Sequence, residues 1–193
     1  MGKLPVLKQK EGFTLIELLV VAAIIGILLS IAIPNLIKAR ISANEASAKK
    51  TLQTVRDAEY EYFEQDLNND GERNFTAFIV GAGGSLRDPE NTQDEEDSLI
   101  DSSFEEAEST GFTADCVDPK SGYCLVFSDD PSLPPVSAGM DDFGWEVSMT
   151  MFRKTGRKDF SVYADKNIRC TVSTQASGSP GKYESQRSDV DCD

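Results

Sequence analysis

The sequence contains no histidine and a single tryptophan in 193 residues. The lack of histidine excludes Ser–His and Cys–His nucleophile pairs, His-ligated zinc and acid–base catalysis by imidazole. Positive charge is also scarce, because 19 Lys and Arg stand against 33 Asp and Glu, a formal net charge of −14. Nucleic-acid binding needs the opposite balance and is not expected. The composition therefore predicts a protein that is not an enzyme and has no cofactor, apart from the calcium candidate below.

The apolar residues that are present gather near the N-terminus. Residues 1–12 hold three lysines and one acid, and residues 13–37 then carry one charged side chain, Glu17. As a helix rising about 1.5 Å per residue, residues 13–37 reach about 37 Å, enough to cross a hydrocarbon core of about 30 Å. The basic leader is expected in the cytoplasm, which places the chain after residue 37 on the other side of the membrane.

Two general explanations of this segment are incomplete. A cleaved signal peptide would have Ser30-Ile31-Ala32 as its small-residue site, but the apolar run is long for a signal and contains Glu17. A plain signal anchor accounts for length and orientation. It gives no reason for a carboxylate within the apolar segment, where an unpaired charge is costly.

The sequence of residues 11–17, EGFTLIE, resembles the processing site of type IV pilins and of the related type II secretion pseudopilins. The resemblance implies that a prepilin peptidase cuts between Gly12 and Phe13 and methylates the new N-terminus, and that the apolar helix is retained. Gly26 and Pro34 also fall where such pilins carry a glycine and a proline. The resemblance is strong over residues 10–50 and holds only in outline beyond them.

The same resemblance implies a role in assembly for Glu17. In the family this carboxylate is taken to pair with the N-terminal amine, here that of Phe13, on an adjacent subunit and so to set the axial register. A buried amine needs such a partner. Gly26 and Pro34 both weaken a helix, which predicts kinking or local melting of this stretch during assembly. A curved membrane helix that tolerates both residues is the alternative.

Residues 38–67 contain no Gly or Pro and have the composition of a helix. Their apolar residues form one stripe, which predicts that the second half of a long helix over residues 13–67 lies against a domain. The stripe consists of Ile37, Ile41, Ala48, Leu52, Val55, Tyr62 and Phe63.

The helix is expected to end in a stretch that partly matches a calcium loop. Asp66, Asn68 and Asp70 alternate and are followed by a glycine, as at the start of an EF-hand. The Glu that an EF-hand needs six residues after the glycine is replaced by Ala77. A solvated turn is therefore the favoured interpretation, and calcium binding is the alternative.

Residues 68–193 are expected to form a head domain. A glycine cluster at residues 81–84 predicts a flexible turn, and residues 88–108, with ten acids and no base, predict a solvated and poorly ordered loop. Alternating apolar residues then predict four antiparallel strands that cover the helix stripe. The strands are expected around residues 123–128, 143–151, 160–164 and 168–172, the second of them half-buried, with turns at residues 154–156 and 165–167. The predicted fold is α+β and type IV pilin-like.

Four cysteines allow two disulfides in a head outside the cytoplasm, and three pairings are possible. We favour Cys116 with Cys124 and Cys170 with Cys192, so that the second bond fastens the polar C-terminal tail. A four-cysteine metal site is disfavoured because no C-x-x-C pair exists. A tail bounded by a disulfide also resembles many type IV pilins, where it forms exposed surface.

The predicted function is that of a structural subunit of a type IV pilus. The resemblance implies a monomer held in the bacterial inner membrane by lipid contacts, processed by prepilin peptidase, and assembled with minor pilins and inner-membrane machinery into a helical homo-oligomer on the cell surface. A type II secretion pseudopilin in the periplasm is the first alternative, which Cys192 disfavours and Asp66–Asp70 keeps open. A signal-anchored extracytoplasmic binding module is the second.

Overall fold

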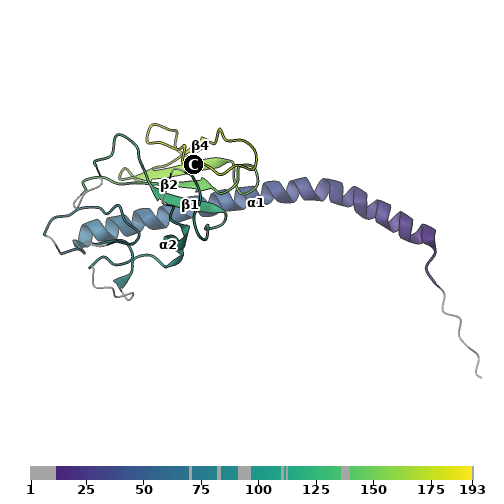
Figure 1. Cartoon of the computed structure of the whole chain (residues 1–193), viewed down its shortest axis with the longest axis horizontal. Helices are drawn as coiled ribbons and strands as arrows, with labels where there is room; N and C mark the ends of the chain where they lie inside the picture. Colours follow the sequence, from purple (N-terminus) through teal and green to yellow (C-terminus); the bar gives the residue numbers. More distant parts are fainter. Residues whose placement is uncertain are drawn as a thin grey trace, which may run out of the picture. The chain divides into compact units, whose positions relative to one another are not determined.

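The computed structural model describes residues 12–69, 71–81, 84–90, 97–109, 111, 113–135 and 140–192. The chain divides after Lys38 into an N-terminal unit and a head of residues 39–193. The elements are α1 (Leu15–Gln65), α2 (Ser103–Ala107), β1 (Tyr123–Phe127), β2 (Gly144–Met149), β3 (Lys158–Tyr163) and β4 (Ile168–Val172), labelled in Figure 1. The predicted leader, except Gly12, lies outside the described residues.

Helix α1 has 51 residues and runs without interruption through Gly26 and Pro34. Its N-terminal part is apolar on every side, and its side chains up to Ile37 are exposed in the single chain, Ile37 at 45%. α1 is the one helix of the described residues that is long and apolar enough to span a membrane. The predicted long helix is confirmed, whereas the assignment of Ile37 to the packed stripe is wrong, because this residue precedes the head.

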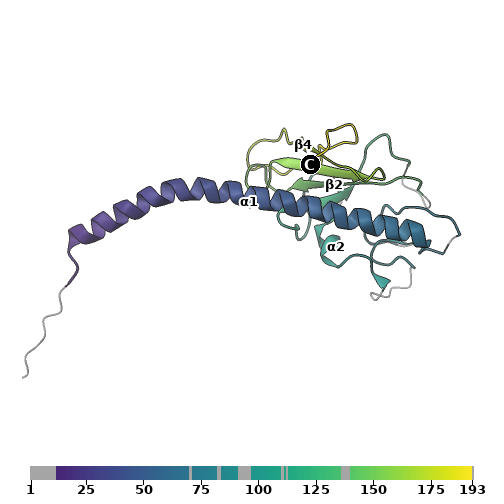
Figure 2. The same ribbon diagram turned by 180° about the vertical axis from the view of Figure 1, so that it is seen from behind.

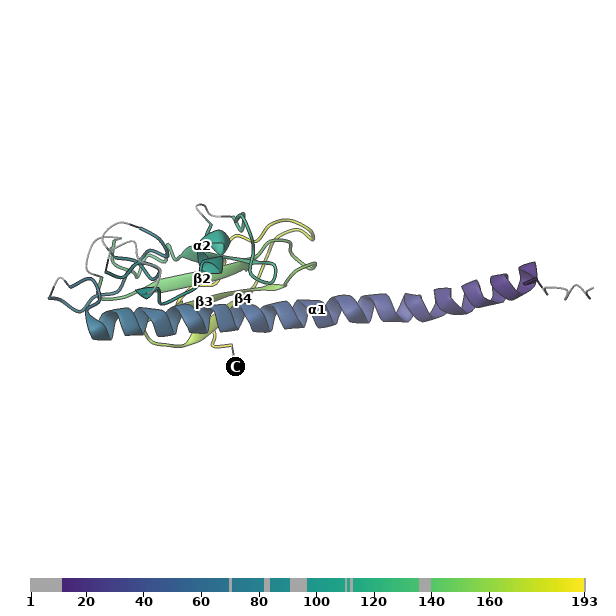
Figure 3. The same ribbon diagram turned by 90° about the horizontal axis from the view of Figure 1, so that it is seen from below.

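In the head, α1 lies along one face of a four-stranded antiparallel sheet, as Figures 1 and 2 show from opposite sides. The strands follow one another in the order β1-β2-β3-β4, and Trp145 of β2 lies opposite Phe127 of β1 and Val162 of β3. The strands run beside the helix rather than across it (Figure 3). The predicted α+β fold is therefore confirmed.

The core lies between the helix and the sheet. Trp145, Val147 and Phe160 are buried on the sheet side, and Phe143 packs beside them. The buried residues of α1 are Ile41, Ala48, Thr51, Leu52, Val55, Ala58, Glu59 and Tyr62. Most of them are three or four positions apart, which is the spacing that an amphipathic helix requires.

The opposite face of the sheet is also covered, so the prediction of a half-buried β2 is wrong. All six residues of β2 are buried, including Glu146 and Ser148. The C-terminal tail crosses this face, where the Gly181 amide donates to the Met149 carbonyl at 2.8 Å and the hydroxyls of Ser161 and Ser185 are 2.9 Å apart. The polar residues on alternate positions of β2 predicted a face exposed to solvent, but that face is covered by the polar C-terminal tail.

Two disulfides hold the outer parts of the head. Cys116 is bonded to Cys124 and Cys170 to Cys192, with Cα–Cα distances of 5.8 and 5.7 Å, the pairing that we favoured from the sequence. The end of the tail extends the sheet beyond β4, because the Cys170 amide donates to the Val190 carbonyl and the Cys192 amide to that of Ile168. The tail therefore pairs with the edge of β4.

The acidic segment is more ordered than its composition predicts. Residues 97–108 contain α2, and Ile100, Phe104 and Ala107 are buried. The Lys120 ammonium lies 3.9 Å from the centre of the Phe104 ring, and Arg87 forms an ion pair with Glu105. The burial of these three apolar side chains orders this part of the segment despite its many acids. Residues 91–96 of the segment lie outside the described part.

The glycine cluster is likewise held in place where it is described. Gly84 has φ +101°, and a Cβ there would overlap the Tyr62 hydroxyl. Its carbonyl accepts a hydrogen bond from the Thr76 hydroxyl at 3.1 Å. Close packing against α1 therefore requires glycine at this position, and the prediction of a flexible turn is wrong for it. Gly83 is not among the described residues.

Candidate functional site

The N-terminus of α1 is closed by a capping box between Thr14 and Glu17. The Thr14 amide and hydroxyl donate to Glu17 Oε2 at 2.8 and 2.6 Å, and the Glu17 amide donates to Thr14 Oγ1 at 3.3 Å. These bonds satisfy backbone donors that would have no partner in the first helical turn. In the single chain, Glu17 is thus engaged by its own helix. The T-x-x-E spacing was visible in the sequence, and we missed its meaning.

The predicted cleavage site lies immediately before this cap. Gly12 and Phe13 have no regular secondary structure, and the Phe13 side chain is 85% exposed. The amide that Glu17 binds belongs to Thr14, the residue directly after Phe13. An amine created on Phe13 would therefore begin close to a carboxylate of its own chain, and the cap bonds use only Oε2 of that carboxylate.

Gly26 and Pro34 are the other two predicted assembly residues. Both are exposed within the continuous α1, and a Cβ on Gly26 would meet nothing within 4 Å. The hydroxyl of Ser30, which precedes Pro34 by one helical turn, donates to the Ile27 carbonyl at 2.7 Å. The structure thus shows an intact helix at both positions, and melting during assembly stays a prediction.

A buried carboxylate joins α1 to the sheet, and the apolar pattern of the sequence did not indicate it. Glu59 is fully buried and accepts hydrogen bonds from the Trp145 indole at 2.7 Å and from the Thr76 amide at 3.2 Å. Burial raises the pKa of Glu59 to about 8, although both hydrogen bonds oppose the shift. The one signal in the sequence was the single tryptophan, because a buried indole N–H needs an acceptor.

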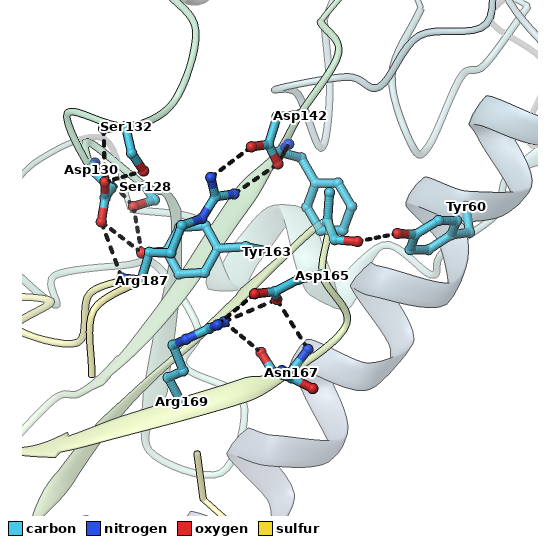
Figure 4. A network of polar contacts seen from close by, with 12 residues as sticks. Tyr60, Ser128, Asp130, Ser132, Asp142, Tyr163, Asp165, Asn167, Arg169 and Arg187 are labelled. Atoms are coloured by element: carbon cyan, nitrogen blue, oxygen red, sulfur yellow. Dashed lines mark hydrogen bonds and ion pairs between the residues drawn. The ribbon is translucent and has the colours of Figure 1, made fainter. Parts of the chain in front are cut away.

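A second polar network holds the tail and the β3–β4 turn to the head (Figure 4). Arg187 in the tail binds the Asp142 carboxylate at 2.7 Å, and its amide donates to Asp130 Oδ2 at 3.1 Å. Arg169 binds Asp165 in the turn, and this hydrogen bond is the main cause of the lowered pKa of Asp165. The Tyr60 hydroxyl donates to the backbone carbonyl of Ala164. These contacts hold the tail and the β3–β4 turn in place against the rest of the head.

The outer face of the head carries a pocket of about 820 Å³ at the end of β1 and the start of β2. Glu146 lies in it and is 2% exposed; its Oε1 accepts from the Ser128 hydroxyl, whereas its Oε2 has no hydrogen-bond partner in the described part of the chain. Burial raises the pKa of Glu146 to about 8, and burial together with Glu105 raises that of Glu108 to about 7. The walls include Phe78, Val126, Phe127, Asp129, Lys182, Tyr183 and Glu184.

The calcium candidate lies just after α1. Asp66 has φ +48°, and its Oδ2 accepts from the Gly71 amide at 3.1 Å. The Asn68 amide nitrogen donates to Asn74 Oδ1 at 3.3 Å, and Asp70 lies outside the described residues. Within the described ranges, no three acidic or cysteine residues are grouped so as to hold a metal. The observed bonds are those of a turn, and the calcium candidate stays a prediction.

The long apolar N-terminal helix and the four-stranded antiparallel sheet form an α+β, type IV pilin-like layout. Residues 7–33 match the family described as the prokaryotic N-terminal methylation motif. This match covers 27 of the 193 residues and concerns the N-terminal segment alone.

Three curated relatives are type IV pilins. The type IV major pilin protein PilA of Myxococcus xanthus is 46% identical over 63 residues, which are 32% of this chain and 29% of the relative. In Thermus thermophilus, the type IV narrow pilus major component PilA5 is 48% identical over 50 residues (26% of this chain, 43% of the relative). The type IV wide pilus major component PilA4 of the same organism is 56% identical over 39 residues (20% and 30%). The chain matches less than half the length of each relative. No solved structure matches it significantly.

Proposed function

We propose that this chain is a structural subunit of a type IV pilus. The observation that carries the proposal is the uncovered apolar surface of α1 from Leu15 to Ile37, joined to a processing motif and to a folded head. A surface that is apolar on every side needs lipid or other copies of itself around it. A filament core supplies the second environment, because the apolar helices of many subunits pack against one another.

Before assembly, the same helix would hold the monomer in the inner membrane, with the leader in the cytoplasm and the head outside. Prepilin peptidase would then cut between Gly12 and Phe13 and methylate Phe13. The exposure of both residues ahead of the capped helix supports this step. Minor pilins and the inner-membrane assembly machinery are the expected further partners, and no catalytic role is proposed.

Assembly would then pair Glu17 with the amine of a neighbouring Phe13, through Oε1 or by release of the cap bonds on Oε2. The cap contributes about 1 kcal/mol at an N-terminus, whereas a buried unpaired amine costs several kcal/mol. Loss of the cap in favour of the Glu17–amine pair is therefore favourable only when a neighbouring subunit buries the amine. The carboxylate is thus available for pairing at the moment of packing.

Imaging of cell-surface fibres tests the proposed function. Long fibres that shear from the surface and contain this chain support a pilus. Short fibres confined to the periplasm support the type II secretion pseudopilin, which is the second candidate because of Asp66–Asp70. A rise in the melting temperature of the purified chain on addition of calcium would add weight to that candidate. A monomeric head on an uncut anchor would support a binding module instead.

A further inference from the structure

The turn between β2 and β3 concentrates positive charge in an acidic chain. Arg153, Lys154, Arg157 and Lys158 fall within six residues, and the first three of them are exposed. None of these four side chains forms an ion pair with a residue that the structure describes. Other bases of the head do, namely Arg56, Arg87, Lys120, Arg169 and Arg187. The charge of this turn is therefore available to a partner outside the head.

The turn packs beside the first residues of the head on α1. The Thr155 carbonyl accepts a hydrogen bond from the Asn44 side chain at 2.8 Å, and the Arg157 amide donates to Glu45 Oε1 at 3.0 Å. Arg40 precedes Asn44 by four positions and so lies on the same face of α1. Its side chain is exposed and forms no ion pair within the described ranges. A fifth unpaired base thus belongs to the same part of the head.

We call Arg40 and residues 153–158 the basic end. Along the chain it lies close to the apolar segment of residues 13–37, because the helix rises only about 10 Å from Ile37 to Asn44. The Debye length in about 0.1 M salt is also about 10 Å, so charges at this separation are not fully screened from one another. A bilayer that holds the apolar segment would therefore act on these bases through its surface charge.

An exposed apolar side chain accompanies the bases. Met151 lies between β2 and the basic end and is 42% exposed. Its amide donates to the Thr155 hydroxyl at 3.0 Å, which holds it beside the turn. Apolar side chains next to lysines and arginines are typical of segments that lie at the level of lipid headgroups. The turn therefore has both features of a surface that binds a membrane.

Glu45 and Glu184 are acids close to the basic end, and neither is bonded to one of its basic side chains. Glu45 accepts from a backbone amide. Glu184 accepts from the Thr174 amide and hydroxyl, at 2.6 and 2.8 Å, and from the side chain of Gln175. These two acids reduce the net charge of the region, and they leave the donors of the bases free for another anion.

We propose that the basic end docks on the anionic phospholipid headgroups of the membrane that holds the monomer. This inference rests on the proposed function, since the monomer is the form whose apolar segment lies in a bilayer. The lipid phosphates supply the charge that the bases lack within the head, and the Met151 side chain can enter the apolar layer beneath them. The contact holds the head at the membrane surface until the subunit enters a filament.

Acetylation of lysines in the full chain tests the docking. The chain is placed in small bilayer discs of phosphatidylcholine, with or without phosphatidylglycerol, and treated with a neutral acetylating reagent. We expect Lys154 and Lys158 to react about fivefold more slowly in the anionic discs, and high salt to remove the difference. Lys166 is the internal control, because its ammonium lies 3.9 Å from the ring of Tyr60, about 24 Å further along the helix than Asn44. Its rate should be the same in both discs.

Two variants separate charge from shape. Arg153→Gln with Arg157→Gln removes two charges but keeps both lysines as reporters, and is expected to abolish most of their protection. Arg153→Lys with Arg157→Lys keeps the charge and should preserve it. Both arginines are exposed, so neither pair of changes should prevent folding. Arg73→Gln, at another exposed arginine outside the basic end, is the matched control and should leave the protection unchanged.

Equal reaction of Lys154 and Lys158 in the two kinds of disc would overturn the docking and leave the pilus function untouched. Protection that is the same in both discs but grows with the number of chains per disc would also overturn it, because the partner would then be a second copy of the chain. Failure of the chain to enter the discs would contradict the proposed function itself, and the docking with it.

Discussion

At the scale of the residue, two glutamates on α1 have opposite surroundings. Glu17 lies in an exposed, otherwise apolar stretch and bonds only to its own helix end. Glu59 lies in the core of the head and accepts from an indole and a backbone amide. The first is the residue proposed to pair with a neighbouring subunit, and the second fixes the helix on the sheet. The importance of Glu17 could be predicted from its apolar neighbours. Glu59 lies among ordinary helix residues, and only its contact with Trp145 in the folded head distinguishes it.

Glu17→Ala is expected to leave cleavage after Gly12 unchanged and to abolish fibres, because the Phe13 amine loses its partner in the packed state. Thr14→Ala is the matched control: it removes the hydroxyl of the cap but keeps the carboxylate, and should reduce fibre yield far less. Immunoblots of processed and unprocessed chain, together with fibre counts, measure both effects. A normal number of fibres from Glu17→Ala would refute the role given to this residue.

Glu59 is expected to make the head less stable as the pH rises. Its pKa of about 8 in the folded state exceeds the ordinary value of 4.5, so the folded chain binds more protons between these two values and stability falls as the pH rises from about 4.5 to about 8. Glu146 contributes in the same direction.

Thermal unfolding of the full chain in detergent, followed by the fluorescence of Trp145, measures this effect. The melting temperature should be lower at pH 9 than at pH 6, and Glu59→Gln should reduce the difference. A melting temperature that stays constant or rises over this range, and that Glu59→Gln does not change, would contradict the raised pKa of Glu59.

At the scale of the element, the helix and the four strands could be predicted well because their apolar spacing is regular. Prediction failed where one element covers another. The polar positions of β2 predicted exposure to solvent, yet the C-terminal tail covers them. The many acids around α2 predicted a disordered loop, yet three apolar residues in that segment are buried against the head. The spacing of apolar residues predicts whether a segment is a helix or a strand. Which other segment packs against it depends on contacts between residues far apart in the chain.

The tail is expected to depend on its disulfide. Replacement of Cys170 and Cys192 by serine should lower the free energy of unfolding by about 3 kcal/mol and release the strand-like pairing at the edge of β4. Hydrogen exchange at the amide of position 192, which is bonded to the Ile168 carbonyl at 2.8 Å, reports the release directly.

The matched variant replaces Cys116 and Cys124, which close a shorter loop and should leave the β4 edge protected. If the Cys170–Cys192 variant keeps both its stability and its slow exchange, the hydrogen bonds of the tail alone hold it in place.

At the scale of the whole molecule, charge and apolar surface are separated along the sequence. The apolar segment of residues 13–37 carries one acid, and the other acids that follow Gly12 belong to the residues after Ile37. Repulsion between such acidic heads opposes close packing, so a filament needs both a strong apolar core and local pairing of opposite charges. The uncovered N-terminal part of α1 is the surface proposed to form the apolar core.

The mass of the N-terminal peptide in sheared cell-surface fibres tests whether this chain is processed and assembled as a pilin. We expect a subunit that begins at Phe13, bears one methyl group on its amine and retains the whole of α1. Fibres without this chain, or a chain that begins after Ala32 as a cleaved signal peptide would leave it, would refute this function.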